Sequence, residues 1–529
     1  MILLRFIFSL VLSLCASSHV LAINLSSLHE VQLPTPATLG DRTLGTAIAT
    51  SGSIAAVAAY SDDDNTASSI YLYAANENWR LSAELKSEYT ADDFARHIIL
   101  VDNLLIVSAN RDGDHGVNSG AVYIFERNLT ANPHHWQQID KLTPPDAQAG
   151  DQFGSAIAFV KGKLYIGAPL RGQGKVYIFT RDAESGFWQF TDSIEPKDPQ
   201  ALRFGAAIAQ DGQALIIGAP YTDADNSEKA DVKKLQPRFA ISKGDTFDPG
   251  IESGAIFVYQ YIAGQWQATV RLGATNRETG DHLGEQVAIE EDIIVASIKH
   301  KDVFDDLRAG AVYVYRNVNN AWQEDTALIA SDPNIGANFG NSFSLRDKKI
   351  LVGANKIHAN GFNSGQAYLF AQNSNNIWEL VHQQENAALK AHDQFGLSVA
   401  LETEHMLIAS KHAVYAFQNT AIQYHPAIFY SDSNTLQLNE VGLAEIGVLT
   451  ATLHLSQQTS ELLLTLTEFH LRTDIDLSEI NYSISTGRLT IPQLAIQTST
   501  GEAAFYSVVL QQIKNASSLQ FQVLSINPI

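Results

Sequence analysis

Alternating apolar and polar side chains predict a β-hairpin early in the chain. The alternating runs Ser155–Val160 and Lys163–Ile166 flank the turn pair Lys161-Gly162. Successive side chains of a strand point to opposite faces, so this pattern is typical of two paired strands. Gly167-Ala168-Pro169 ends the second strand, because proline has no N–H to donate to a sheet. A third strand is predicted over Lys175–Phe179.

The same pattern recurs seven times. Each copy begins with an apolar or aromatic residue and a small one: Leu44-Gly45, Phe94-Ala95, Phe153-Gly154, Phe204-Gly205, Leu283-Gly284, Phe339-Gly340 and Phe395-Gly396. Each second strand ends near a triplet: Ala58-Ala59-Tyr60, Ser108-Ala109-Asn110, Gly167-Ala168-Pro169, Gly218-Ala219-Pro220, Ala296-Ser297-Ile298, Gly353-Ala354-Asn355 and Ala409-Ser410-Lys411. From the second residue of the pair to the first of the triplet, the distance is 13 in six copies and 12 in the fifth. A constant distance preserves which face each side chain occupies, and therefore indicates a repeated hairpin.

These pairs and triplets resemble the FG-GAP repeat, the unit of the seven-bladed propeller in integrin α subunits and in many bacterial exported proteins. The resemblance covers roughly residues 28–418, and the third and fourth copies carry the complete motif. It implies an all-β fold, a seven-bladed β-propeller, followed here by a small C-terminal β domain.

The N-terminal segment is expected to close the ring of blades. A strand bearing tryptophan precedes each later pair, whereas the seventh copy stops at Phe417 with three strands. Val31-Gln32-Leu33-Pro34 is similar to the segments before later copies, such as Ile139–Pro144. We therefore expect a propeller over residues 23–420 in which this segment supplies the missing fourth strand. One tryptophan per outer strand indicates packing between blades rather than sugar binding: Trp79, Trp136, Trp188, Trp266, Trp322 and Trp378.

The two ends of the chain differ from the repeats. Residues 1–22 have the pattern of a secretory signal, with Arg5, an apolar core and a small-residue cleavage site at Val20-Leu21-Ala22. We therefore expect a periplasmic, cell-surface or extracellular protein. Residues 421–529 contain two loosely related segments whose starts, Tyr430 and Tyr482, are 52 residues apart. They predict a small β domain resembling a sandwich of two sheets.

Composition excludes some classes of partner. The formal net charge is −22, so phosphate backbones would repel the chain and nucleic acid is not expected as a ligand. After residue 22, no apolar run is long enough for a transmembrane helix.

Repeated carboxylates stand just before the Phe-Gly positions. Asp92, Asp151, Asp281 and Asp393 each lie three residues before the second residue of a pair. One carboxylate per blade cannot converge on a single substrate, so we expect these side chains to cap turns.

Calcium binding is the remaining question of ion chemistry. The calcium loops of integrin-type blades lie between pair and triplet, where this chain has short turns such as Lys161-Gly162 and Asp347-Lys348. The spacing Asn110-x-Asp112-x-Asp114 resembles half an ion loop, and acidic loops also occur at Asp62–Asn65 and Asp223–Asp225. We expect solvated polar loops there; calcium at Asn110, Asp112 and Asp114 is the alternative. No catalytic or cofactor-binding residue is predicted.

The blade-four insertion Asn226–Glu252 is either a tolerated loop or part of a binding face.

The chain contains no Gly-x-Ser-x-Gly, His-Glu-x-x-His or phosphate-loop motif. The sequence therefore predicts an exported non-catalytic binding or adhesion protein, with a protein or glycan ligand on the loop-rich face of the propeller near the central channel. Two alternatives stay open. One is a polysaccharide-acting enzyme with its site at the channel, and the other is a structural component of a surface assembly.

Overall fold

The computed structural model describes most of the chain. The described residues are 28–61, 66–75, 79–87, 92–127, 135–182, 186–223, 251–303, 308–384, 388–403 and 405–419, and the backbone of eight further strands between Ala427 and Pro528. The predicted signal at 1–22, the loop at 62–65 and residues 226–250 of the insertion lie outside them. Two compact units emerge, one containing 30–126 and 136–417 and the other containing 418–529. Each is described by itself.

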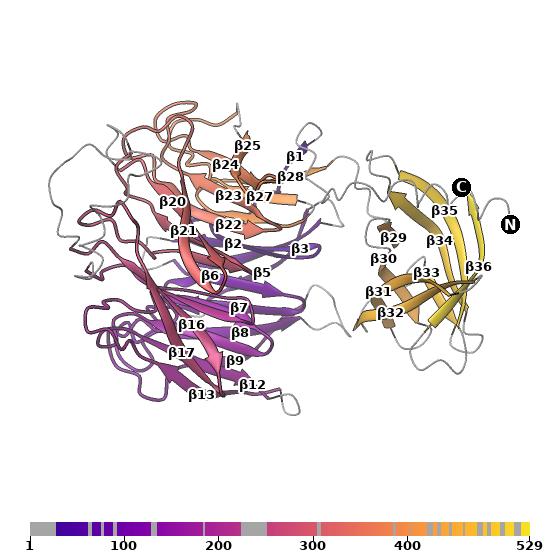
Figure 1. The fold of residues 1–529 in the computed structure, drawn as a ribbon, viewed down its shortest axis with the longest axis horizontal. Helices are drawn as coiled ribbons and strands as arrows, with labels where there is room; N and C mark the ends of the chain where they lie inside the picture. The colour runs from indigo at the N-terminus through magenta and orange to yellow at the C-terminus, as the bar shows by residue number, and fades with distance from the viewer. Residues whose placement is uncertain are drawn as a thin grey trace. The chain divides into compact units, whose positions relative to one another are not determined.

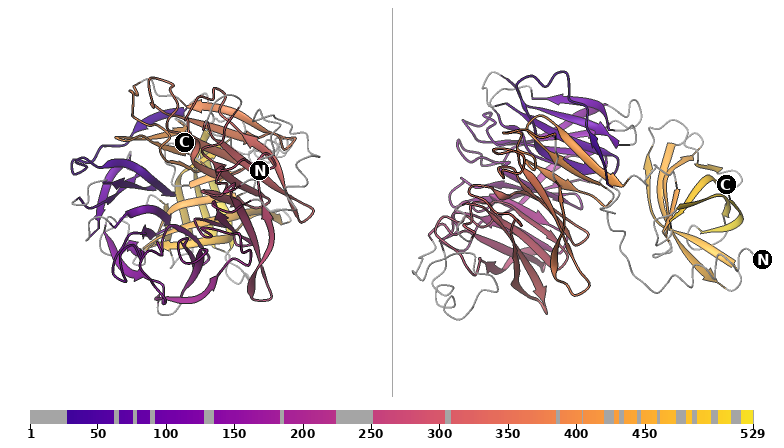
Figure 2. Two further views of the ribbon diagram at one scale, coloured as in Figure 1. Left: turned by 90° about the vertical axis from the view of Figure 1, so that its left-hand side faces the viewer. Right: turned by 90° about the horizontal axis from the view of Figure 1, so that it is seen from above.

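Seven four-stranded antiparallel sheets form the propeller (Figure 1). The left panel of Figure 2 views the blades roughly along the axis of the ring. Blade one contains β2 (Thr43–Ser51), β3 (Ile54–Tyr60), β4 (Ser69–Ala74) and β5 (Arg80–Lys86). Blade two contains β6 (Phe94–Val101), β7 (Leu104–Ala109), β8 (Ala121–Arg127) and β9 (Trp136–Leu142). Blade three contains β10 (Ala156–Val160), β11 (Lys163–Ala168), β12 (Lys175–Arg181) and β13 (Trp188–Ile194). Blade four contains β14 (Ala207–Gln210), β15 (Ala214–Ala219), β16 (Ala255–Ile262) and β17 (Gln265–Leu272). Blade five contains β18 (Val287–Glu290), β19 (Ile293–Ile298), β20 (Ala311–Val318) and β21 (Ala321–Leu328). Blade six contains β22 (Phe339–Arg346), β23 (Lys349–Ala354), β24 (Gln366–Gln372) and β25 (Trp378–Gln384). Blade seven contains β26 (Val399–Leu401), β27 (His405–Ala409), β28 (Val414–Asn419) and β1 (Leu28–Gln32). The fold is all-β, and the described part contains no helix long and apolar enough to cross a membrane.

The hairpin predicted from the alternating pattern is confirmed in blade three. Val160 pairs with Lys163 and Ala156 with Gly167, so Lys161 and Gly162 form the turn. Both turn residues have left-handed backbones, with φ of 47° and 73°, which is the geometry of tight hairpin turns. The second strands are buried on both faces, as in β15, while outer strands such as β13 keep solvent-exposed positions. The cores therefore lie between adjacent blades.

The two glycine positions of the repeat meet across three of the blade boundaries. A Cβ atom on Gly167 would lie 2.0 Å from the carbonyl oxygen of Gly205 in the next blade. Gly218 and Gly353 face Gly284 and Gly396 in the same way, each at 2.1 Å. The preceding phenylalanine packs edge-on against the third strand of its own blade, as Phe153 does on Tyr177 with ring centroids 5.5 Å apart. The motif thus combines a close backbone contact with an aromatic anchor.

The fifth copy has the same spacing as the others, which corrects the sequence alignment. Ser297, not Ala296, pairs with the second residue of the third strand, Val312, just as Gly167 pairs with Val176. A Cβ atom on Gly340 would also lie 3.3 Å from the Ser297 Cβ, at the boundary where other copies have their triplet glycine. From Gly284 the distance is then 13 residues. The sequence comparison placed the triplet one residue too early because it matched small residues, and Ala296 is smaller than Ser297.

The N-terminal strand completes the seventh sheet. β1 lies next to β28, and the Leu33 N–H donates to the Val414 carbonyl at 2.8 Å. Leu33 is only 1% exposed and belongs to a core cluster shared by blades one and seven. Across this boundary the Ser398 hydroxyl donates to the Gly45 carbonyl at 2.6 Å. Strands from both ends of the propeller sequence therefore share one sheet.

The tryptophans pack into the cores between adjacent blades, as expected. Trp136, Trp188 and Trp378 are buried in core clusters at the start of outer strands. Trp79 is buried one residue before β5, and Trp266 and Trp322 are half-buried against neighbouring cores.

The C-terminal unit contains a single eight-stranded sheet. Its strands are β29 (Ala427–Tyr430), β30 (Thr435–Leu443), β31 (Gly447–Gln458), β32 (Glu461–Arg472), β33 (Ile480–Ser483), β34 (Arg488–Gln497), β35 (Ala503–Gln512) and β36 (Gln520–Pro528). β32 pairs with β36, which joins the two halves of the sheet, and β29 also pairs with β34 and β30 with β33. The predicted sandwich of two sheets stays a prediction. The two related segments form the two halves of the sheet, each a short strand followed by three longer ones. Their irregularities match, since pairing shifts register at Leu438/Val441 and at Ile491/Leu494.

Candidate functional site

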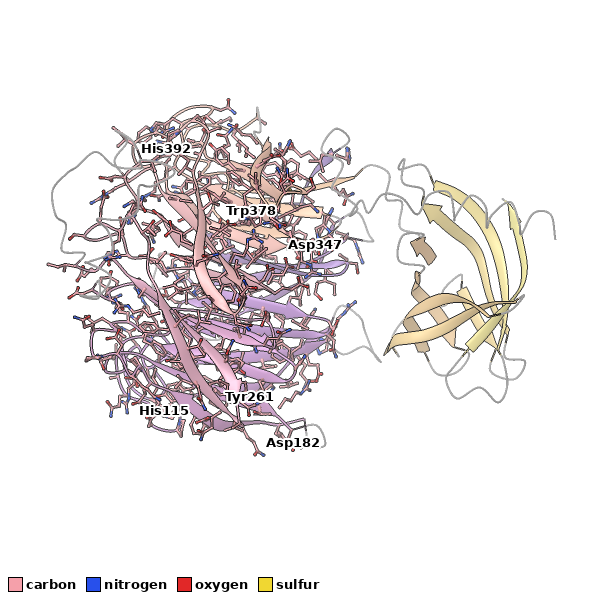
Figure 3. All side chains as sticks on the ribbon, viewed as in Figure 1. His115, Asp182, Tyr261, Asp347, Trp378 and His392 are labelled. Atoms are coloured by element: carbon pink, nitrogen blue, oxygen red, sulfur yellow. The ribbon has the colours of Figure 1, made fainter. Side chains whose placement is uncertain are left out.

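The propeller has two unlike faces. Short turns join the first and second strands of each blade, whereas longer loops join the second and third strands. Loops that lead from an outer strand to the next blade emerge on the same side as the longer loops, because neighbouring strands are antiparallel. We call this side the long-loop face. Figure 3 shows His115 and His392 on it, and Asp182 and Asp347 on the opposite side.

The repeated aspartates cap turns on the long-loop face, as predicted. Each carboxylate accepts a hydrogen bond from a nearby backbone N–H: Asp92 from Phe94 at 3.1 Å, Asp151 from Gln148 at 2.8 Å, Asp281 from Glu278 at 2.6 Å and Asp393 from Lys390 at 2.7 Å. These groups are used by the scaffold and do not converge on one point.

A lysine occupies the position where the half ion loop would place a cation. The Lys141 ammonium lies 2.8 Å from Asp112 Oδ2 and 2.5 Å from Asp114 Oδ2. Tyr123 also donates to Asp112 at 2.7 Å. Burial favours a raised pKa for the Asp112 carboxyl, but the hydrogen bonds from Lys141, the Asp114 N–H and Tyr123 hold that pKa below its usual value. Asn110 Oδ1 has no hydrogen-bond partner among the described residues, whereas Asp112 and Asp114 share the Lys141 ammonium.

In six of the seven copies, the residue before the Phe-Gly position has a left-handed backbone. This holds for Asp93, Gln152, Arg203, His282, Asn338 and Gln394, with φ between 52° and 58°. The position varies in chemistry from blade to blade, although its backbone does not. Two of these side chains contact the same aromatic ring, since His282 stacks on Tyr221 at 4.4 Å and Arg203 lies over it at 4.2 Å. The repeat therefore presents a variable side chain on the long-loop face at a constant backbone geometry.

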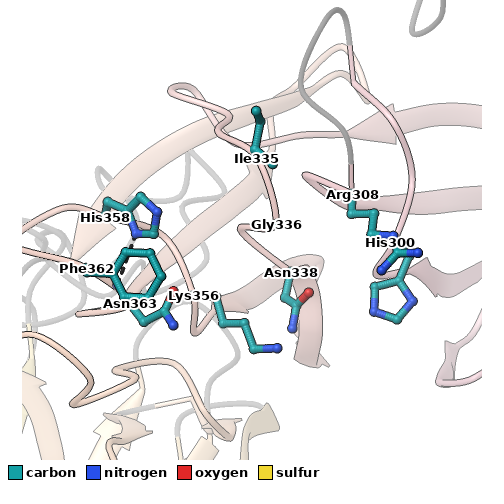
Figure 4. Close-up of a pocket in the computed structure, with 9 residues that line it drawn as sticks. All are labelled: His300, Arg308, Ile335, Gly336, Asn338, Lys356, His358, Phe362 and Asn363. Atoms are coloured by element: carbon teal, nitrogen blue, oxygen red, sulfur yellow. Dashed lines mark hydrogen bonds between the residues drawn. The ribbon is translucent and has the colours of Figure 1, made fainter.

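A pocket of about 280 Å³ opens on this face at blades five and six (Figure 4). His300 and Arg308 come from the β19–β20 loop, and Ile335, Gly336 and Asn338 come from the loop between the two blades. The β23–β24 loop contributes Lys356, His358, Phe362 and Asn363. We call this site the loop pocket. Residues 304–307 of the first loop lie outside the described residues.

Backbone hydrogen bonds hold the three loops of the pocket together. The Phe339 N–H donates to the Ala309 carbonyl at 2.8 Å, which places Arg308 beside Asn338. The Lys356 N–H donates to the Ala337 carbonyl at 3.2 Å. Because these bonds join main chain to main chain, the pocket residues can vary while its frame is retained.

One end of the loop pocket is cationic. Within the described chain, no carboxylate forms an ion pair with Arg308 or Lys356. Asn338 is 7% exposed, and its side-chain amide has no protein hydrogen-bond partner among the described residues. Burial, followed by the positive charge of Lys299, lowers the pKa of His300, which favours the neutral ring at neutral pH.

The other end of the loop pocket is apolar and aromatic. Phe362 is 59% exposed, yet it stacks on His358 with centroids 4.7 Å apart and meets His392 edge-on at 5.4 Å. His358 Nδ1 accepts a hydrogen bond from the Asn363 N–H at 3.0 Å. The His392 N–H donates to the Phe362 carbonyl at 2.8 Å, which ties this loop to the next blade. Ile335, 64% exposed, completes this end.

Comparison with known families agrees with the geometry of the blades. The FG-GAP repeat matches residues 136–179, 266–315 and 322–370. These three segments are FG-GAP repeats. A search of curated proteins found no match.

The FG-GAP repeats are out of phase with the blades. The repeat at 136–179 contains β9 and β10–β12, and the other two likewise begin at an outer strand and end in the third strand of the next blade. A chain built from whole repeats therefore begins with an outer strand and ends with a third strand, as β1 and β28 do here. The loop pocket is formed by the repeats at 266–315 and 322–370.

Sequence reasoning did not identify the loop pocket. It singled out carboxylates, whereas the nine pocket residues include none. The available signal was the cluster of histidine, lysine and arginine in the two loops that follow the triplets of copies five and six, in an acidic chain.

Proposed function

We propose that this protein is an exported, non-catalytic binding protein of the adhesion type, and that its ligand binds the long-loop face. The propeller supports this proposal as a rigid scaffold, since its cores and blade contacts leave the loops free to vary. The observation that carries the proposal is the loop pocket, where unpaired cations, an open amide and an exposed aromatic ring meet on that face. Export rests on the signal predicted at residues 1–22.

The chemistry of the loop pocket favours binding over hydrolysis. Glycoside hydrolysis requires two carboxyl groups on either side of the scissile bond. The pocket residues provide none, and the described repeated aspartates bind backbone N–H groups. A polysaccharide-acting enzyme would therefore need a different set of residues.

The test is binding by the full chain without its signal. The protein is immobilised and exposed to cell-surface polysaccharide and protein fractions, and bound material is eluted and weighed by mass spectrometry. We expect saturable binding that returns the ligand with unchanged mass. Lys348→Asn, on the short-turn face, is the control and should not weaken it. Failure to retain any ligand, or recovery of shortened saccharide, would contradict the proposal.

A further inference from the structure

We propose that the loop pocket binds an acidic saccharide, with the carboxylate or sulfate group at Arg308 and Lys356 and the sugar ring against Phe362. The inference rests on the proposed binding function and specifies its ligand class. It draws on three features of the pocket: unpaired cations, a buried open amide and a fixed aromatic surface.

The cations point to an anionic group. The whole chain has a formal net charge of −22, yet the described lining of this pocket includes Arg308 and Lys356 and no carboxylate. Some other cations on the same face are paired, as Lys141 is with Asp112 and Lys301 with Asp281. Two unpaired cations close together repel each other, and an anion between them would remove that cost and accept charge-assisted hydrogen bonds.

The amide of Asn338 adds specificity. Asn338 is 7% exposed and lines the pocket, and its amide has no protein partner among the described residues. The amide is therefore available to a ligand hydroxyl or oxyanion. Asn338 precedes Phe339 and has the left-handed backbone found at this position in six of the seven copies, with φ of 55°.

The aromatic end distinguishes a sugar from a free ion. Phe362 exposes more than half of its surface but is held by His358, His392 and the hydrogen bond from the His392 N–H. An exposed ring that is already fixed loses little entropy when a ligand packs on it. Inorganic phosphate or sulfate would use only the cationic end. A sugar ring carrying an acidic group has an apolar face for Phe362 and hydroxyls for Asn338.

The volume sets the size of the ligand. At about 280 Å³ the pocket lies at the lower end of the range for small-molecule sites. It suits one acidic sugar unit with part of its neighbour, which is consistent with binding along or at the end of a polysaccharide.

The test uses calorimetric titration of the full chain with defined probes. The probes are a tri-galacturonate, its methyl ester, inorganic sulfate and a tri-glutamate peptide. We expect the trisaccharide to bind, and the ester, sulfate and peptide to bind at least about tenfold more weakly. Arg308→Ala/Lys356→Ala should weaken trisaccharide binding by about tenfold or more. Phe362→Ala should weaken it without altering the weak binding of sulfate.

The matched control removes two exposed cations elsewhere. Lys197→Ala/Lys348→Asn has the same change in charge, and asparagine tolerates the left-handed backbone of residue 348, with φ of 54°. Equal loss in both double variants would reduce the effect to net charge and overturn the inference. Equal affinity for the peptide would assign the pocket to acidic peptides instead. If cell-surface ligands are retained and Arg308→Ala/Lys356→Ala has no effect on them or on the trisaccharide, this inference fails while the proposed binding function stands.

Discussion

At the scale of the residue, the repeat is explained by backbone atoms that meet between blades. The triplet glycine has no side chain because the carbonyl of the next blade lies where a Cβ atom would be, as between Gly167 and Gly205. Ala58, Ser108 and Ser297 stand at the same register position in blades one, two and five. Glycine in the triplet therefore marks a boundary where the backbones of two blades are in close contact.

Gly167→Ala should destabilise the propeller by about 1–3 kcal/mol, because the new methyl group must displace the backbone of blade four. Gly113→Ala is the control, since a Cβ atom there would meet nothing closer than 4.0 Å. Urea unfolding followed by tryptophan fluorescence measures both. Equal stability of the two variants would show that the blades separate at no cost.

A buried histidine makes the boundary of blades one and seven sensitive to acid. His405 contacts Trp79 edge-on at 5.2 Å, and burial lowers its pKa from 6.5 to about 4. The folded state therefore binds the proton less readily than the unfolded state. Its contribution to stability is complete above pH 6.5 and is lost as the pH falls from 6.5 to about 4.

His405→Phe should flatten the pH dependence of unfolding, because the aromatic contact is retained and the titrating group is removed. Between pH 7 and pH 4 the unmodified protein should lose up to roughly 3 kcal/mol more than the variant. Urea titrations at several pH values measure the difference, and carboxylates that titrate in both proteins cancel. Parallel pH curves would contradict the role of His405.

At the scale of the element, the phase of the repeat determines how the ring closes. Each FG-GAP repeat begins with an outer strand, so β1 has no blade of its own and pairs with β28. The edge of β28 would otherwise present unpaired backbone groups. Closure thus joins the first and last strands of the propeller through hydrogen bonds and through the core around Leu33.

Leu33→Ala should destabilise the propeller by about 2–5 kcal/mol, because it leaves a cavity in the core shared by blades one and seven. Gln32→Ala, at an exposed position of β1, should be nearly neutral. Deletion of residues 23–36 should go further and produce aggregation through the exposed edge of β28. Thermal melting and size-exclusion chromatography follow these effects. A deletion variant that stays monomeric with an unchanged melting temperature would exclude closure by β1.

At the scale of the whole molecule, we expect stability to be independent of calcium. The hairpin turns lack acidic ion loops, and Lys141 neutralises Asp112 and Asp114. A site holding calcium at a hundredfold excess over its dissociation constant would add about 2.7 kcal/mol, or several degrees of melting temperature. Melting in excess chelator and in millimolar calcium should differ by far less. A shift of several degrees that Asp112→Ala/Asp114→Ala abolishes would instead establish an ion site there.

The sequence by itself determined the blades and the order of their strands. The period of two, the tight turns and the constant distance from Gly154 to Gly167 are local properties, and local geometry limits what such segments can form. Ring closure also followed from the sequence, because an outer strand was missing after Phe417 and present before Leu44. The turn-capping role of Asp151 was predictable for the same reason, since its partner, Gln148, lies three residues away.

Only the tertiary structure decided the register at Ser297, the partner of Asp112 and the existence of the loop pocket. Lys141 lies on β9 and Asp112 in the loop after β7, and Arg308, Asn338 and Lys356 line one pocket only because the ring places three loops side by side. No periodicity links such residues. Contacts between distant segments depend on how blades pack and how loops bond to one another, and a pattern along one strand contains no information about the side chains that the next blade brings beside it.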